Sequence, residues 1–154
     1  MNQKSIVLNK ELASFTVDYL NHFIRQHSAQ YSRVLYKDDP ANFALLLEYT
    51  IRARDEINKE LQTKIKANIL KRIWCYAFLG QELNYGASIS CKTAKVISFL
   101  TGLFIDSLQS KLTQKNYVQG ENEDLVKRIL CHTLNLNNFL NTQLKLHEKA
   151  ALKI

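Results

Sequence analysis

Apolar residues recur every three or four positions over most of the chain, which is the spacing of one face of an α-helix. In the first such segment the repeat falls on Leu12, Phe15, Tyr19 and Phe23. Asn9 stands directly before it, where its side-chain oxygen can accept a hydrogen bond from an unpaired backbone N–H of the first turn. The pattern predicts a helix that begins after Asn9 and extends to about Tyr31.

A second helix is predicted to begin at Pro40. A proline fits the first turn of a helix because the N–H that it lacks would have no partner there, and Asp39 can cap the same end. From Ala41 to Leu79 the sequence contains neither Gly nor Pro. A continuous helix over that stretch would be about 58 Å long, whereas a compact domain of this size has a radius of gyration of about 15 Å. We therefore expect a break near residues 62–64.

The alternative to a break is a continuous helix whose protruding half is covered by a second copy of the chain. The candidate oligomer stripe would then consist of Ile57, Leu61 and Ile65. Gly80 and Gly86 are expected to end the helix that carries residues 65–79.

A later helix is predicted from about Cys91 to Gln114, capped by Ser88 or Ser90. Its inward positions are Ala94, Ile97, Leu100, Phe104 and Leu108. Gly102 lies in the middle, where Gly costs about 1 kcal/mol relative to Ala, so we expect a neighbouring helix to approach closely there.

The last helix is predicted to follow a connection at residues 116–120 and to open with the acids Glu121, Glu123 and Asp124, which suit the positive end of a helix dipole. Its apolar stripe comprises Leu125, Ile129, Leu136, Leu140 and Leu144. The chain has 154 residues but four Gly and one Pro, too few turn residues for an all-β fold. The prediction is an all-α, single-domain bundle over residues 1–154, with about five helices and short connections.

The net charge of +7 is unevenly distributed. The first 60 residues carry eight basic and eight acidic side chains, whereas residues 61–119 carry eight basic and two acidic ones. This asymmetry suggests an anionic partner, although a solvated basic face or an acidic protein partner accounts for the same residues. The candidate anion-binding residues are Lys64, Lys66, Lys71, Arg72, Lys92 and Lys95.

Residues 86–93, GASISCKT, match the phosphate-binding loop pattern GxxxxGK[ST] except that Cys91 replaces the second Gly. The loop needs that Gly where the backbone meets the phosphate, and a parallel sheet around it. We interpret the segment instead as a capped helix start.

The four histidines lack the spacing of a helical metal site, and Cys75, Cys91 and Cys131 fall on apolar segments where buried, inert thiols are expected. The carboxylate pairs fit helix caps and charged helix faces. The sequence therefore predicts no enzyme, no metal site and no cofactor.

Three cysteines without paired spacing favour a reducing compartment, and the start of the chain lacks the apolar region of a signal peptide. The longest apolar run, Val96–Ile105, is too short to span a bilayer and is expected to be a helix buried on most sides. We expect a soluble, cytoplasmic protein. Export by a route that needs no cleaved signal peptide stays an alternative.

The function favoured by these features is a non-catalytic helical protein-interaction or regulatory module with a protein partner, for which a homodimer is one option. Small helical modules of this composition include immunity proteins, secretion chaperones and translocated bacterial effectors. The alternative is a regulator that binds nucleic acid through the basic residues of the middle third.

Overall fold

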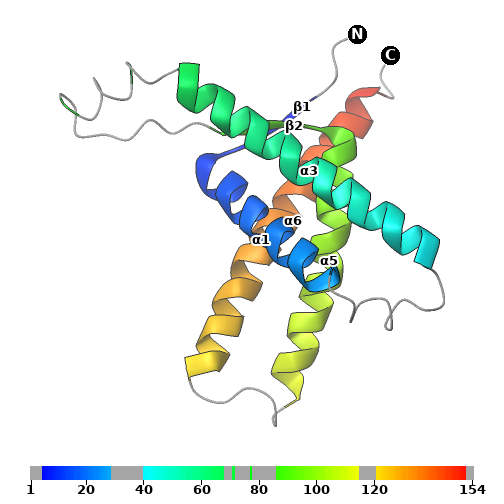
Figure 1. The fold of residues 1–154 in the computed structure, drawn as a ribbon. Helices are drawn as coiled ribbons and strands as arrows, with labels where there is room; N and C mark the ends of the chain where they lie inside the picture. The colour runs from blue at the N-terminus through cyan, green and yellow to red at the C-terminus, as the bar shows by residue number, and fades with distance from the viewer. Residues whose placement is uncertain are drawn as a thin grey trace. The chain divides into compact units, whose positions relative to one another are not determined.

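The computed structural model describes residues 5–28, 40–67, 71, 77, 86–114 and 121–151, of which 90% are helical. Within these ranges the fold has four helices, which are labelled in Figure 1: α1 (Lys10–Ser28), α3 (Pro40–Ala67), α5 (Cys91–Thr113) and α6 (Glu121–Ala151). Two short strands accompany them, β1 (Ser5–Leu8) and β2 (Ala87–Ser90). The all-α class is confirmed, and four helices stand close to the expected five.

The chain divides into two compact units. The amino-terminal unit comprises Ser5–Ser90 and the carboxyl-terminal unit carries Cys91–Ile154. The prediction of a single domain over residues 1–154 stays a prediction.

The amino-terminal unit begins as the sequence indicates. Asn9 caps α1, because its Oδ1 accepts a hydrogen bond of 2.8 Å from the backbone N–H of Leu12. Pro40 is the first residue of α3, as predicted. The predicted cap at Asp39, the helix end at Tyr31 and the stop at Gly80 lie outside the described residues.

The predicted break at residues 62–64 is wrong, because α3 continues through them to Ala67. Thr63 Oγ1 donates to the Lys59 carbonyl at 2.7 Å, and Lys64 forms an i,i+4 ion pair with Glu60. Both contacts lie within one helix, and the segment contains no residue that breaks a helix.

A two-stranded antiparallel sheet, which the sequence did not predict, completes this unit. Its register pairs Ser5 with Ser90 and Leu8 with Ala87. One face is fully buried and carries Ile6, Leu8, Ala87 and Ile89. This alternation is the period-two pattern of a strand with one covered face.

Gly86 makes the sheet possible. A Cβ at this position would lie 1.8 Å from the Leu8 carbonyl oxygen and 2.8 Å from its carbon. Both are backbone atoms that cannot rotate away, so a side chain would push β1 off β2.

The carboxyl-terminal unit is a hairpin in which α5 and α6 pack along each other (Figure 1). Of the five inward positions predicted on α5, four are buried and Phe104 is half-buried. On α6 the predicted stripe is buried at Leu136, Leu140 and Leu144, whereas Leu125 at its start is exposed. The predicted connection at residues 116–120 lies outside the described residues.

The two helices are also joined by a network of amides and hydroxyls. Asn137 donates from Nδ2 to the Ser98 carbonyl and to Thr101 Oγ1, both at 2.8 Å. Asn141 donates to Asn137 Oδ1 at 2.9 Å and lies 2.6 Å from the Ser98 hydroxyl, which donates to its Oδ1. Since these bonds have fixed directions, they set the register of the hairpin where apolar packing alone would allow sliding.

Candidate functional site

The six basic residues singled out in the sequence fall in both units. Lys64, Lys66, Lys71 and Arg72 belong to the amino-terminal unit, and Lys92 and Lys95 begin α5 in the other. The side chain of Lys66 and the whole of Arg72 lie outside the described part of the chain. Lys71 and Lys92 are exposed.

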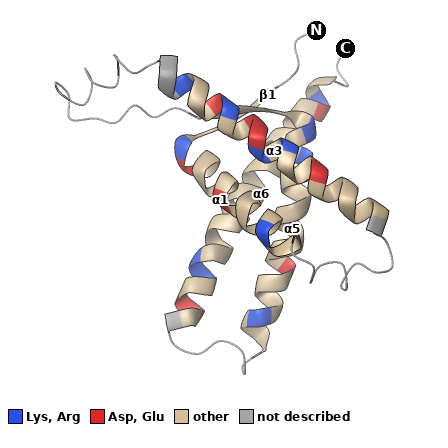
Figure 2. Cartoon of the chain, in the orientation of Figure 1, with Lys and Arg blue, Asp and Glu red and all other residues tan. Residues whose placement is uncertain are grey.

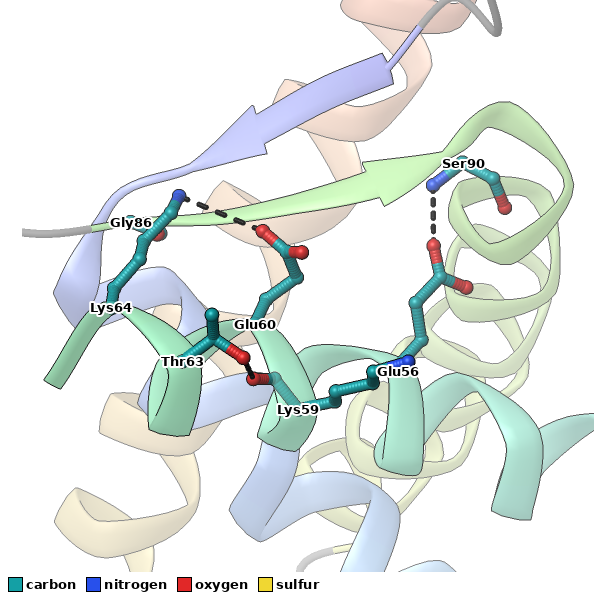
Figure 3. Close-up of polar contacts among 7 residues, drawn as sticks. All are labelled: Glu56, Lys59, Glu60, Thr63, Lys64, Gly86 and Ser90. Carbon is teal, nitrogen blue, oxygen red and sulfur yellow. Dashed lines mark hydrogen bonds and ion pairs between the residues drawn. The ribbon is translucent and has the colours of Figure 1, made fainter. Parts of the chain in front are cut away.

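Lys64 forms a hydrogen bond and an ion pair within the amino-terminal unit. Its Nζ donates to the Gly86 carbonyl at 2.7 Å and lies 3.8 Å from Glu60 Oε2 (Figure 3). The side chain is 34% exposed, so the ammonium still reaches solvent. It satisfies a backbone acceptor at the start of β2, which makes Lys64 a structural residue of this unit.

Glu56 makes the complementary contact two turns earlier on α3. Its Oε1 accepts a hydrogen bond of 2.7 Å from the backbone N–H of Ser90, at the other end of β2 (Figure 3). A cation thus meets a carbonyl and a carboxylate meets an N–H, so each charge is matched to the polarity of the backbone group. We call these two contacts, Lys64–Gly86 and Glu56–Ser90, the α3–β2 clasp.

The remaining charges along α3 are mixed in sign, as Figure 2 shows. Arg52 pairs with Glu48, and Arg54 pairs with the adjacent Asp55 at 2.7 Å. In the carboxyl-terminal unit, Lys95 lies 3.4 Å from Glu148, with both side chains largely exposed. Exposed pairs of this kind contribute little to stability, about 0–1 kcal/mol each.

One residue of the candidate oligomer stripe lies in the core of the amino-terminal unit. Ile57 is fully buried and Leu61 is half-buried. The side chain of Ile65 lies outside the described residues. Ile57 is therefore a core residue of the single chain.

A different apolar surface is exposed on α5. Phe99 and Leu103 are 55% and 51% exposed and stand one helical turn apart on the same face. Gly102 lies beside them, and a Cβ there would meet nothing within 4 Å. We call these three residues the α5 outer face.

This surface departs from the sequence-based expectations at two points. Most of the run Val96–Ile105 is buried or half-buried as expected, but Phe99 and Leu103 are exposed. The expected close approach of a neighbouring helix at Gly102 is also wrong, since the space beside it is open. The buried residues of the run are Ile97, Leu100, Thr101 and Ile105.

The described His, Cys and carboxylate side chains were candidates for a metal or thiol site. Among the described residues no three His, Cys, Asp or Glu side chains lie together as a metal site would require. Cys131 is exposed and Cys91 half-buried, so the expectation of buried thiols is wrong for these two, while Cys75 lies outside the described part of the chain. Residues 87–90 form a strand that leads directly into α5, which leaves no loop of free N–H groups to wrap a phosphate.

His27 packs against aromatic rings of α1 and α3. The His27 ring is tilted by 44° against that of Phe23 at 4.2 Å, and it meets Phe43 of α3 edge-on at 5.7 Å, between centroids. Burial, and to a smaller extent the charge of His22, lower the pKa of His27. The arrangement is that of an aromatic contact between two helices.

Sequence reasoning missed the α3–β2 clasp and the α5 outer face. The clasp joins residues 22 and 34 positions apart, and no local pattern announces such a pairing. The exposure of Phe99 and Leu103 could have been predicted, because both stand on the same helical face as Lys92 and Asp106, which are exposed.

Comparison with known proteins identifies no relative: no family model, no curated protein and no solved structure matches the chain. Within the described residues, no helix has both the length and the apolar character needed to cross a membrane.

Proposed function

We propose that this chain is a non-catalytic protein-interaction module, acting in a reducing compartment such as the cytoplasm, whose contact surface includes the α5 outer face. The observation that carries the proposal is the exposure of Phe99 and Leu103 side by side on one helix face. Large apolar side chains that stand together in water are typical of binding surfaces, whereas scattered ones are ordinary.

The chemistry of this surface favours a helix as the partner. Phe99 and Leu103 offer apolar contacts at i and i+4, and the open space at Gly102 allows a second backbone to come close. Lys95 and Asp106 stand on the same exposed side of α5 and supply both charges around the apolar centre.

Nucleic-acid binding is the second proposal, and the exposure of Lys71 and Lys92 favours it. Two of the other basic candidates, Lys64 and Lys95, contact acidic side chains of the chain itself, which reduces the charge they can offer to phosphate. With about four phosphate contacts, the logarithm of the binding constant would fall with the logarithm of salt at a slope of about −3 to −4.

The test is affinity capture from native lysate, with and without nuclease. It compares the native chain with the double variant Phe99→Ser/Leu103→Ser and with a control, Leu45→Ser, at an exposed leucine of α3. The proposal predicts a protein that survives nuclease, is lost with the double variant and is kept with the control. Capture that the double variant leaves unchanged would contradict it, and capture that nuclease abolishes would support the second proposal.

A further inference from the structure

The two strands of the small sheet differ in how their outer edges are covered. The N–H of Ser90 donates to Glu56 of α3, so the backbone of Ser90 points away from β1. Opposed residues of an antiparallel pair alternate between hydrogen-bonded and non-hydrogen-bonded positions. Since Ser5 is opposite Ser90 and Val7 is opposite Ser88, the N–H and C=O groups of Ser5 and Val7 point away from β2.

The outer edge of β2 is closed by α3, which lies on the side away from β1 and bonds both ends of the strand through the α3–β2 clasp (Figure 3). The outer edge of β1 has no such closure among the described residues. In the described part of the chain no group bonds the outward N–H and C=O of Ser5 or Val7. The Val7 side chain is 61% exposed.

The residues of β1 also lack the devices that keep a strand edge from pairing. Ser5–Leu8 contains no charged residue and no proline, and the register runs without a bulge. Proteins protect free edges with such features because unpaired N–H and C=O groups recruit another strand.

We propose that β1 pairs antiparallel with β1 of a second copy of this chain, joining the two small sheets across a two-fold axis. The edge is self-complementary: Ser5 lies opposite Val7 of the second copy, and Ile6 lies opposite Ile6 at the axis. Each outward N–H then meets a C=O. No like charges face each other within the paired segment, and β-branched side chains are favourable neighbours across strands. The interface is isologous, as in most homodimers.

The expected dimer is weak. A four-residue strand is about 13 Å long, and pairing along it buries less than the roughly 1,200–2,000 Å² of a stable interface. We expect a dissociation constant of the order of 10–100 μM, so the dimer forms and dissociates with concentration.

Sedimentation equilibrium up to about 500 μM, well above that dissociation constant, tests the proposal on the full chain with three variants at Val7. Val7→Pro removes the outward N–H, which the pairing with β2 does not use. Val7→Lys keeps the backbone intact and places two like charges diagonally across the axis on the same face of the joined sheet. Val7→Thr is the control, because it keeps both the N–H and the β-branched shape.

The native chain and Val7→Thr should dimerise, whereas Val7→Pro and Val7→Lys should stay monomeric with unchanged circular dichroism. If Val7→Pro does not fold, the oligomeric state of Val7→Lys still tests the proposal. A native chain that is monomeric at the highest concentration would overturn the proposal, and so would a dimer that Val7→Lys leaves intact.

Amide hydrogen exchange gives a second, residue-specific measurement. The amide of Val7 should exchange more slowly as concentration rises, because only the dimer gives it an acceptor. The amide of Ile6, which points toward β2, should exchange at a rate independent of concentration. The double variant Phe99→Ser/Leu103→Ser should leave both results unchanged, which separates this interface from the α5 outer face. A Val7 exchange rate that does not depend on concentration would count against the dimer.

Discussion

Glu56 holds the end of β2 in place: its Oε1 accepts a hydrogen bond of 2.7 Å from the backbone N–H of Ser90. The bond joins the middle of a 28-residue helix to a strand 34 positions later in the chain. Without it, a half-buried backbone donor would have to find another acceptor or lose its hydrogen bond on folding.

Replacing Glu56 should therefore destabilise the amino-terminal unit, and the loss should be larger when the new side chain cannot accept the hydrogen bond from Ser90. We expect Glu56→Ala to lower the free energy of unfolding by about 1–2 kcal/mol, and Glu56→Gln, which keeps an oxygen, by less. Glu60→Ala is the matched control one turn later, since its exposed ion pair with Lys64 contributes under about 0.5 kcal/mol. Urea unfolding measures all three, and equal losses for Glu56→Ala and Glu60→Ala would contradict the assigned role.

The two described glycines should respond oppositely to the same substitution. Gly86→Ala places a Cβ against the backbone of Leu8, and we expect it to destabilise the fold by about 1–3 kcal/mol. Gly102→Ala adds a methyl group in open space on a helix and should stabilise it by about 0.5–1 kcal/mol. Thermal unfolding of both variants checks the pair, and a destabilising Gly102→Ala would show that a neighbour does occupy that space.

Replacing Asn137 should lower the free energy of unfolding more than replacing its neighbour Asn138. Asn137→Ala removes the donor shared by the Ser98 carbonyl and Thr101 Oγ1, for an expected loss of about 1–2 kcal/mol in the free energy of unfolding. Asn138 is exposed on the same helix, so Asn138→Ala should change that free energy by less than about 0.5 kcal/mol. Chemical denaturation compares the two, and equal effects would mean that the network does not hold the hairpin.

Acidification should destabilise the contact between α1 and α3. Burial lowers the pKa of His27 below its ordinary value of 6.5 in the folded chain. The unfolded chain therefore takes up a proton first as the pH falls through about 6.5, and stability declines until the pH is below the folded pKa. His27→Gln should flatten the stability profile between about pH 7 and 5. An unaltered slope in His27→Gln would refute this assignment.

The sequence was informative where a structure depends on adjacent residues. The cap at Asn9, the helix start at Pro40 and the inward positions of α5 follow from short-range chemistry, and the structure has them where the pattern predicts. The sheet depends instead on two segments about 80 positions apart, and the serine-rich β2 has too weak a strand preference to indicate its partner.

The errors have a similar origin. The break at residues 62–64 was expected because a longer helix would exceed the size of a compact domain. The residues at these positions do not themselves favour a break. The prediction for Val96–Ile105 counted apolar residues without dividing them between two helix faces, so it missed the exposed surface at Phe99 and Leu103.

Site-specific photo-crosslinking tests most directly whether the α5 outer face contacts a protein partner. A photoreactive phenylalanine derivative is placed at position 99 and, as the control, at the exposed position 45 of α3. After irradiation in lysate treated with nuclease, we predict a discrete protein adduct from position 99 that is absent from position 45 and is lost when Leu103→Ser is added. No adduct at position 99, or the same adducts from both positions, would contradict the claim.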